Sequence, residues 1–132
     1  MVTGIGGTGV VTIGALLGMA SHIEGKGAGV MEMAGLAQKG GAVHIHCRIA
    51  ENPADISVVR VASGEAHTLI GGDLLVTAGD KTLSLLRRDR SKVVCNEMEA
   101  ITGEFTRDTE FSLPSDGMKL ALNAKVLSLI HI

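Results

Sequence analysis

The stretch from Val2 to Leu17, VTGIGGTGVVTIGALL, decides the fold of this 132-residue chain. It begins with β-branched residues, continues as a glycine-rich loop, and ends in apolar residues at the three- and four-residue steps of one helix face. The loop has the GxGxxG spacing of strand-to-helix turns in which backbone N–H groups approach a pyrophosphate at the helix N-terminus. The stretch therefore predicts a phosphate-compatible loop that contains Gly4, Gly6, Gly7, Thr8 and Gly9.

Outward from this loop, strand-like runs and helical periodicity alternate along the chain. Val10–Ile23 predicts a helix, and Gly25 and Gly27 end it. Strands are predicted over residues 29–33, 42–49, 56–61, 73–78 and 93–95, and further helices over residues 65–70, 81–86 and 115–129. The runs 42–49 and 56–61 are expected to pair as a hairpin. The prediction is an α/β fold, with a Rossmann-like, mainly parallel sheet that carries an inserted β-hairpin.

The composition excludes several classes of function. Twelve basic and fourteen acidic residues leave a net charge of −2, which argues against nucleic acid as a partner. The two cysteines, Cys47 and Cys95, cannot supply the four thiolates of an iron–sulfur cluster. Because they are few and far apart, we expect reduced thiols in a cytoplasmic protein. The longest apolar stretch, residues 10–20, is too short to span a bilayer, so we expect no membrane association.

A second glycine-rich loop precedes a strand whose residues alternate in polarity. Gln38-Lys39-Gly40-Gly41 can present an amide and an ammonium to an anion, or can be an ordinary lead-in to a hairpin with a solvated lysine. In the strand that follows, His44, His46 and Arg48 share one face. Two histidines are too few for a zinc site, which needs at least three protein ligands, so we expect no metal.

A dinucleotide site is a further possibility. Glu32 lies near the end of the strand that follows the first helix, at the spacing where an acid holds a ribose hydroxyl. The glycines are equally compatible with a tight turn that binds nothing, and Glu32 with a solvated residue at a strand end. The motif alone therefore leaves both interpretations open.

Three stretches taken together resemble one family. These are Val2–Leu17, Gly35–Ile49 (GLAQKGGAVHIHCRI) and Gly71–Ala78 (GGDLLVTA). They resemble the gamma, or catalytic, domain of the 2-oxoacid:ferredoxin oxidoreductases, and most of all the fused bacterial form of the indolepyruvate branch. Residues 93–96 and 105–114 are also similar to that branch, so the resemblance covers the chain to about residue 124.

The resemblance implies an enzyme that uses thiamine diphosphate and iron–sulfur clusters to decarboxylate 2-oxo acids oxidatively to acyl-CoA, with ferredoxin as electron acceptor. It implies that other domains or subunits hold these cofactors, so we expect this chain alone to bind none of them and to be inactive. It identifies no catalytic residue. Motif matching gives these candidate cofactor-binding residues: Gly4, Gly6, Gly7, Thr8, Gly9, Gln38, Lys39, Gly40, Gly41, His46 and Arg48. Lys39 stands where many relatives have Arg, so bidentate anion binding is not expected there.

The resemblance also predicts the extent of the domain. We expect residues 1–126 to form a gamma-type domain, truncated at its N-terminus, and residues 127–132 (LSLIHI) to be a tail that leaves the family pattern and adds little to the fold. The chain is therefore expected to be a fragment of a longer protein. Two alternatives stay open: a free-standing NAD-binding dehydrogenase module, and a non-catalytic interaction domain whose glycine loop binds nothing.

Overall fold

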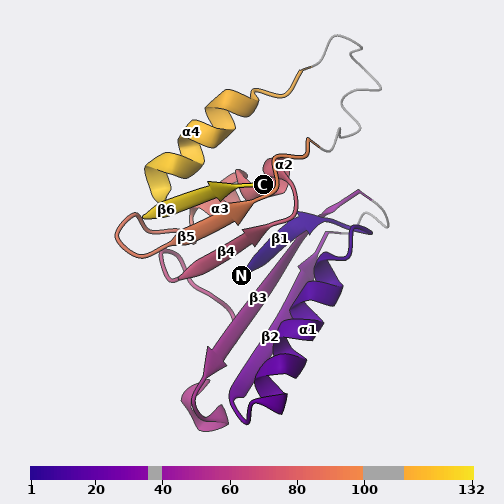
Figure 1. Cartoon of the computed structure of the whole chain (residues 1–132), viewed down its shortest axis with the longest axis vertical. Helices are drawn as coiled ribbons and strands as arrows, with labels where there is room; N and C mark the ends of the chain where they lie inside the picture. Colours follow the sequence, from indigo (N-terminus) through magenta and orange to yellow (C-terminus); the bar gives the residue numbers. More distant parts are fainter. Residues whose placement is uncertain (36–39, 100–111) are drawn as a thin grey trace.

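A six-stranded sheet organises the computed structural model, which describes residues 1–35, 40–99 and 112–132 (Figure 1). The strand order is β2-β3-β1-β4-β5-β6. The strands are β1 (Val2–Ile5), β2 (Gly27–Ala34), β3 (Ala42–Ala50), β4 (Thr68–Gly71), β5 (Lys92–Cys95) and β6 (Ser128–His131). The helices are α1 (Val10–Ile23), α2 (Leu74–Thr77), α3 (Asp80–Leu83) and α4 (Ser115–Lys125), with a 3-10 turn, η1, at Pro53–Asp55.

The directions of the strands confirm the predicted fold class. β1, β4, β5 and β6 pair in parallel, whereas β3 is antiparallel to both of its neighbours, β1 and β2. Because two antiparallel steps restore the direction, β2 runs parallel to β1, and β3 alone runs against the rest. The fold is thus a Rossmann-like α/β sheet in which a hairpin, β2–β3, places one reversed strand beside β1.

Helices cover the two halves of the sheet on opposite faces. On one face, α1 packs over β1, β3 and β2, around the buried Val2, Val10 and Ile45. On the other face, the segments after β4 pack over β4 and β5, around Leu69, Leu74 and Leu122. Figure 1 shows this arrangement, with α1 beside β2 and β3 and with α4 beside β6. In the part of the chain that the structure describes, no helix combines the length and the hydrophobicity needed to cross a membrane.

The partner of β3 in the hairpin differs from the prediction. Residues 43–50 of β3 pair with β2 through eight register positions, and residues 56–61 form no strand. One reason is that the Val61 N–H donates to the imidazole Nδ1 of His46 at 3.0 Å instead of entering a backbone ladder.

Two short segments have the opposite secondary structure from the one predicted. Residues 68–71 form β4 where a helix was expected, and residues 74–77 form α2 where a strand was expected. Asp73 begins α2, because its Oδ1 accepts the N–H of Val76 at 2.9 Å in the manner of an N-cap. Periodicity cannot separate helix from strand in apolar runs this short, and the cap decides between them.

The end of the chain also differs from the expectation. The helix predicted over residues 115–129 ends at Lys125, and Ser128–His131 forms β6, which pairs in parallel with all four residues of β5. Leu129 packs against the core cluster on the α4 face. The last residues are therefore an edge strand of the sheet and not a tail outside it, whereas the domain boundary at residue 126 stays a prediction.

The close packing of α1 on β3 gives a first test of the fold. A Cβ on Gly14 would lie 2.5 Å from Cγ2 of Ile45, whose side chain is completely buried, whereas a Cβ on Gly117 of α4 would meet nothing within 4 Å. We expect Gly14→Ala to lower the free energy of unfolding by about 1–3 kcal/mol through overpacking. The matched Gly117→Ala should raise it by about 0.5–1 kcal/mol through backbone entropy. Urea denaturation measures both, and stabilisation of the chain by Gly14→Ala would contradict the packing described here.

Candidate functional site

The first glycine loop connects β1 to α1 at the carboxyl edge of the sheet. Gly7 and Gly9 have φ angles of 92° and 87°, in the left-handed region that favours glycine. Thr8 closes the loop on itself, because its hydroxyl donates to the carbonyl oxygen of Ile5 at 2.6 Å. Gly9 is the N-cap of α1 and supplies no side-chain cap, so the first-turn N–H groups of this 14-residue helix remain directed at the loop. This is the geometry expected of a phosphate-compatible turn, and phosphate binding itself stays a prediction.

The loop lies where the chain leaves the sheet in two opposite directions. β1 and β4 are parallel neighbours, β1 leads into α1 on one face, and β4 leads toward α2 on the other. The hydroxyl oxygens of Thr3 and Thr77 lie 3.0 Å apart, which holds α2 on the face of β1 away from α1. Open α/β sheets bind ligands in the crevice at the carboxyl ends of such strands. The carboxyl ends of β1 and β4 are therefore the first place to look for a site.

Gly40 and Gly41 meet the first loop at this edge. The N–H of Gly6 donates to the carbonyl oxygen of Gly41 at 2.8 Å, which extends the β1–β3 pairing by one step. The two glycine motifs found in the sequence are thus brought together. Gln38 and Lys39, the other members of the second motif, lie outside the described residues.

Asp73 is a buried acid at the same edge of the sheet. It was not among the site residues predicted from the sequence. Its side chain is 2% exposed, and its Oδ2 has no hydrogen-bond partner in the described part of the chain. Burial raises the pKa of this carboxyl, although N–H groups of Val76 and Leu75 oppose the rise. An ionised oxygen without a partner is costly in such surroundings, which is the physical reason for the raised pKa.

A groove runs from this edge across the face of β3 that α1 does not cover. Two adjoining pockets of about 810 and 460 Å³ form it, and they share Ala42, His44 and Lys81. We call it the His44–Lys81 groove. The larger pocket is also lined by His46 and Arg60, and no Asp or Glu is among its described lining residues; the smaller one reaches Gly40, Gly79 and Asp80. The side chains of Arg60 and Lys81 therefore line the larger pocket, and the nearest lining carboxylate, Asp80, belongs to the smaller one.

Hydrogen bonds define the state of the two histidines in the groove. The Thr82 hydroxyl donates to the carbonyl oxygen of Val76 at 2.8 Å, so the His44 Nε2, 3.2 Å from Thr82 Oγ1, must be the donor in that contact. This tautomer leaves Nδ1 of His44 able to accept a hydrogen bond from a ligand. Burial lowers the pKa of His44, nearby Lys81 lowers it further, and Asp73 opposes the change.

His46 is held in the same tautomer by a different contact. It is almost fully buried, and its Nδ1 accepts the Val61 N–H, so a neutral ring carries its proton on Nε2. Burial lowers the pKa of His46, and the neighbouring His44 and Arg60 lower it further. Both rings are therefore polar and uncharged in the groove at neutral pH, and its positive charge comes from Arg60 and Lys81.

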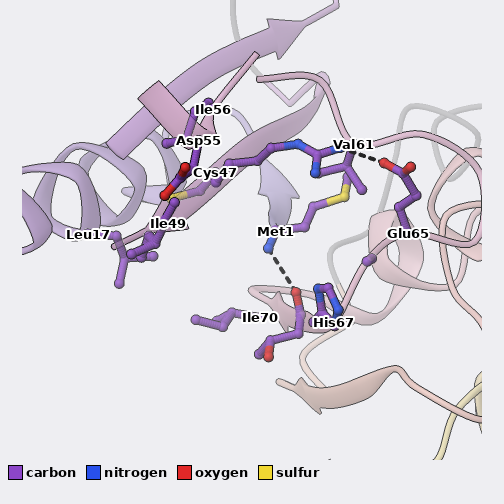
Figure 2. Close-up of a pocket in the computed structure, with 14 residues that line it drawn as sticks. Met1, Leu17, Cys47, Ile49, Asp55, Ile56, Val61, Glu65, His67 and Ile70 are labelled. Atoms are coloured by element: carbon purple, nitrogen blue, oxygen red, sulfur yellow. Dashed lines mark hydrogen bonds and ion pairs between the residues drawn. The ribbon is translucent and has the colours of Figure 1, made fainter. Parts of the chain in front are cut away.

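Arg48 is separated from the glycine loops, although it lies two positions from His46 on the same face of β3. It lies seven positions along β3 from Gly41, which at the rise of a strand is about 23 Å. Its guanidinium pairs with the carboxylate of Glu65 and also donates to the carbonyl oxygen of Arg60 at 3.2 Å. Figure 2 shows the pocket of about 490 Å³ around it, with Met1, Cys47, Glu65 and Ile70 on its walls. Arg48 is thus engaged at the amino end of β1, far from the glycine loops.

The position of Glu32 weighs against the dinucleotide interpretation. The register aligns Glu32 with Ile45 and Ile45 with Val2, so β3 lies between Glu32 and β1. Two strand spacings of about 4.8 Å put Glu32 roughly 10 Å from β1, level with its first residue. In a dinucleotide site the acid follows a strand directly beside β1. The inserted strand therefore removes the arrangement that the spacing of the motif suggests.

The described residues do not fit the redox cofactors that the resemblance implies. Cys95 is buried in β5 and Cys47 is half-buried in β3, with β1 and β4 between them. Among residues 1–35, 40–99 and 112–132, no three His, Cys, Asp or Glu side chains gather as metal ligands would. Thiamine diphosphate needs a metal-held diphosphate, and an iron–sulfur cluster needs more thiolates. We therefore derive no chemical step through either group on this chain, and its cofactor content stays a prediction.

Four residues of the candidate site, His44, Asp73, Arg60 and Lys81, were not predicted from the sequence to bind a ligand. His44 was considered only as a zinc ligand, and no zinc was expected. Asp73 carries a local signal, because an Asp that follows Gly71-Gly72 and precedes an apolar run is a typical helix N-cap. Arg60 and Lys81 carry none, since a cation in a loop or a short helix is usually solvated. Only the packing of α3 and of the segment before β4 against β3 places them with His44.

Comparison with known protein families gives one clear result. The family model described as pyruvate ferredoxin/flavodoxin oxidoreductase matches residues 1–129, nearly the whole chain. The search of curated proteins returned no match.

Asp73 provides a test of the electrostatics of the site. Because its pKa is raised in the folded state, the folded protein holds a proton that the unfolded chain releases above about pH 4. Stability is therefore full below that pH and falls as the pH rises through the folded-state pKa, by about 1.4 kcal/mol for each unit of the shift. Asp73→Asn keeps an oxygen for the Val76 N–H but cannot ionise. We expect it to gain stability relative to the wild type as the pH rises, measured by urea denaturation between pH 4 and 8. If the difference in free energy of unfolding between Asp73→Asn and the wild type stays the same from pH 4 to 8, the raised pKa of a buried Asp73 is contradicted.

Proposed function

Because the chain belongs to the pyruvate ferredoxin/flavodoxin oxidoreductase family, we propose that it is the gamma-type domain of a 2-oxo acid oxidoreductase. Family membership itself implies a role as one part of a multidomain or multisubunit oxidoreductase. The proposed enzyme decarboxylates 2-oxo acids of the indolepyruvate kind to acyl-CoA and passes the electrons to ferredoxin. Thiamine diphosphate and the iron–sulfur clusters supply the decarboxylation and electron transfer, and other parts of the enzyme hold them.

We propose that the contribution of this chain is to bind CoA, and the His44–Lys81 groove carries that proposal. CoA is a polyanion with phosphate groups and a flexible chain. The groove offers two cations and two neutral imidazoles in a larger pocket whose described lining has no acid. Its volume of about 810 Å³ lies in the range of small-molecule sites, roughly 300–1,000 Å³. Charge and size therefore both favour an anionic ligand of this class.

Each residue of the groove is suited to a different group of the ligand. Lys81, an exposed point charge, and Arg60, a planar fork of donors, are suited to phosphate oxygens. His44 is fixed by Thr82 and can accept a hydrogen bond at Nδ1 from a hydroxyl or amide of the ligand. Gly40 lines the smaller pocket and the first glycine loop begins beside it, where backbone N–H groups can bind a further anionic group. None of these roles requires this chain to perform the redox chemistry.

Lys81 gives the direct test of the proposal. Loss of one charged hydrogen bond costs about 1.5–3 kcal/mol, so in the complete enzyme we expect Lys81→Ala to raise the KM for CoA about ten- to a hundred-fold. Lys81→Arg keeps the charge and should stay within a few-fold of the wild type. The matched control is Lys125→Ala, at the exposed end of α4 and away from the groove. Steady-state kinetics at saturating 2-oxo acid measure all three, and an unchanged KM for CoA in Lys81→Ala would reject the groove as the CoA site.

The choice of 2-oxo acid is tested separately. The resemblance of residues 35–49 and 105–114 to the indolepyruvate branch supports an arylpyruvate substrate. We expect kcat/KM of the complete enzyme to be higher for indolepyruvate than for pyruvate, with phenylpyruvate as an intermediate case. A preference for pyruvate would contradict the indolepyruvate assignment and leave the family membership untouched.

A further inference from the structure

The outward face of α1 is apolar and has nothing packed on it among the described residues. From Val10 to Ser21 the helix contains no charged residue. Small residues, Gly14 and Ser21, are buried on its sheet side. Val10 and Leu17 also pack toward the sheet. The other large apolar side chains of the helix point away from it, exposed by 36–78%: Val11, Ile13, Leu16, Met19 and Ile23. A helix that is apolar on all sides is typical of a helix covered on all sides.

The edge of the sheet beside α1 is also open. Gly35 donates its N–H to the carbonyl oxygen of Ala42, so the odd-numbered residues of β2 bond to β3 in the alternation of an antiparallel pair. The even-numbered residues therefore direct their N–H and C=O groups outward. These are Ala28, Val30, Glu32 and Ala34, and all four are exposed. Within the described residues, no strand pairs with this edge.

The helix face and the strand edge form one continuous surface. α1 packs directly on β2, where a Cβ on Gly18 would lie 2.9 Å from Cγ2 of Val30 (Figure 1). Eight strand residues span about 26 Å and fourteen helical residues about 21 Å. β2 contains no Lys, Arg or Pro, the residues that usually protect an open edge from pairing, and Glu32 is its single charge. The edge at β6 differs, because it is half as long.

The size of this surface indicates what covers it. Its length and a width of one helix plus one strand give roughly 400 Å². A stable pair of separate proteins needs about 800 Å² on each partner. Interfaces between domains of one enzyme start at about 600 Å² in total, or about 300 Å² on each side. The surface is therefore of the size that a neighbouring domain covers, and is too small by itself for a second copy of the chain.

We propose that another domain of the same oxidoreductase docks on this surface, adding a β-strand to β2 and packing apolar side chains on α1. The added strand pairs with the outward N–H and C=O groups of the even-numbered residues, so the sheet continues across the domain boundary. The proposal requires only the family membership of the chain, and it holds whether or not CoA binds the His44–Lys81 groove.

Hydrogen exchange in the complete oxidoreductase tests the added strand. The amide of Met31 is directed at β3, whereas those of Val30 and Glu32 are directed outward. We expect Val30 and Glu32 to be protected about as strongly as Met31, at least about 100-fold over an unstructured peptide. Exchange of the two outward amides near the unstructured rate, with Met31 protected, would overturn the proposal.

Two variants of the complete enzyme test the surface independently. Ala28→Pro removes one outward N–H and no ladder hydrogen bond, and Leu16→Lys places a charge on the apolar face of α1. Each is expected to speed exchange of the Val30 and Glu32 amides at least tenfold while Met31 stays protected. The control is Leu120→Lys, on the exposed side of α4, which should change none of them. Protection of the Val30 and Glu32 amides that both variants leave intact would overturn the proposal.

Discussion

The pairing of β3 with β1, which ends in the hydrogen bond from Gly6 N–H to the carbonyl oxygen of Gly41, is the constraint on which the rest of the structure depends. It inserts a reversed strand beside β1, where a dinucleotide-binding fold has the next parallel strand. The same pairing brings two glycine-rich loops to one edge and moves Glu32 away from β1. It also turns the alternating side chains of β3 outward on the face opposite α1, where His44 and His46 line the groove.

The electrostatics of the groove follow from what surrounds each group. Burial keeps both imidazoles neutral, and hydrogen bonds to Thr82 and from Val61 fix their protons on Nε2. Burial likewise raises the pKa of Asp73, although the N–H groups of Val76 and Leu75 oppose the rise. Lys81 and Arg60 are more exposed than the two imidazoles and provide the basic side chains of the groove. A site of this kind attracts an anion without having to desolvate an ion pair first, which is costly in buried surroundings.

Sequence reasoning recovered the elements whose signal is local and missed those decided by tertiary contacts. The α1 helix, the first glycine loop and β5 follow from periodicity and turn chemistry, and the structure has them where they were expected. Residues 56–61 have the composition of a strand, but the Val61 N–H donates to the His46 side chain, and it is β2 that pairs with β3. For the site, the structure places Gly40 and Gly41 beside the first glycine loop and His46 in the groove, whereas Arg48 pairs with Glu65 about 23 Å from Gly41. The binding roles of these residues stay predictions. Arg60 and Lys81 could not be found, because each comes from a different segment and only folding brings them to His44.

The placement of glycine in α1 links packing to assembly. Gly14 and Gly18 let the helix approach β3 and β2 so closely that a methyl group at either position would collide with Ile45 or Val30. Glycine in a helix interior costs about 0.5–1 kcal/mol relative to alanine, so this close approach lowers the intrinsic stability of the helix. A helix needed only to cover its own sheet would recover that cost with larger side chains facing inward. Here only Val10 and Leu17 pack inward, and five large apolar side chains face outward, which is stabilising only where a second layer covers them. The pattern along α1 is therefore that of a helix placed between two layers, with the sheet as one of them.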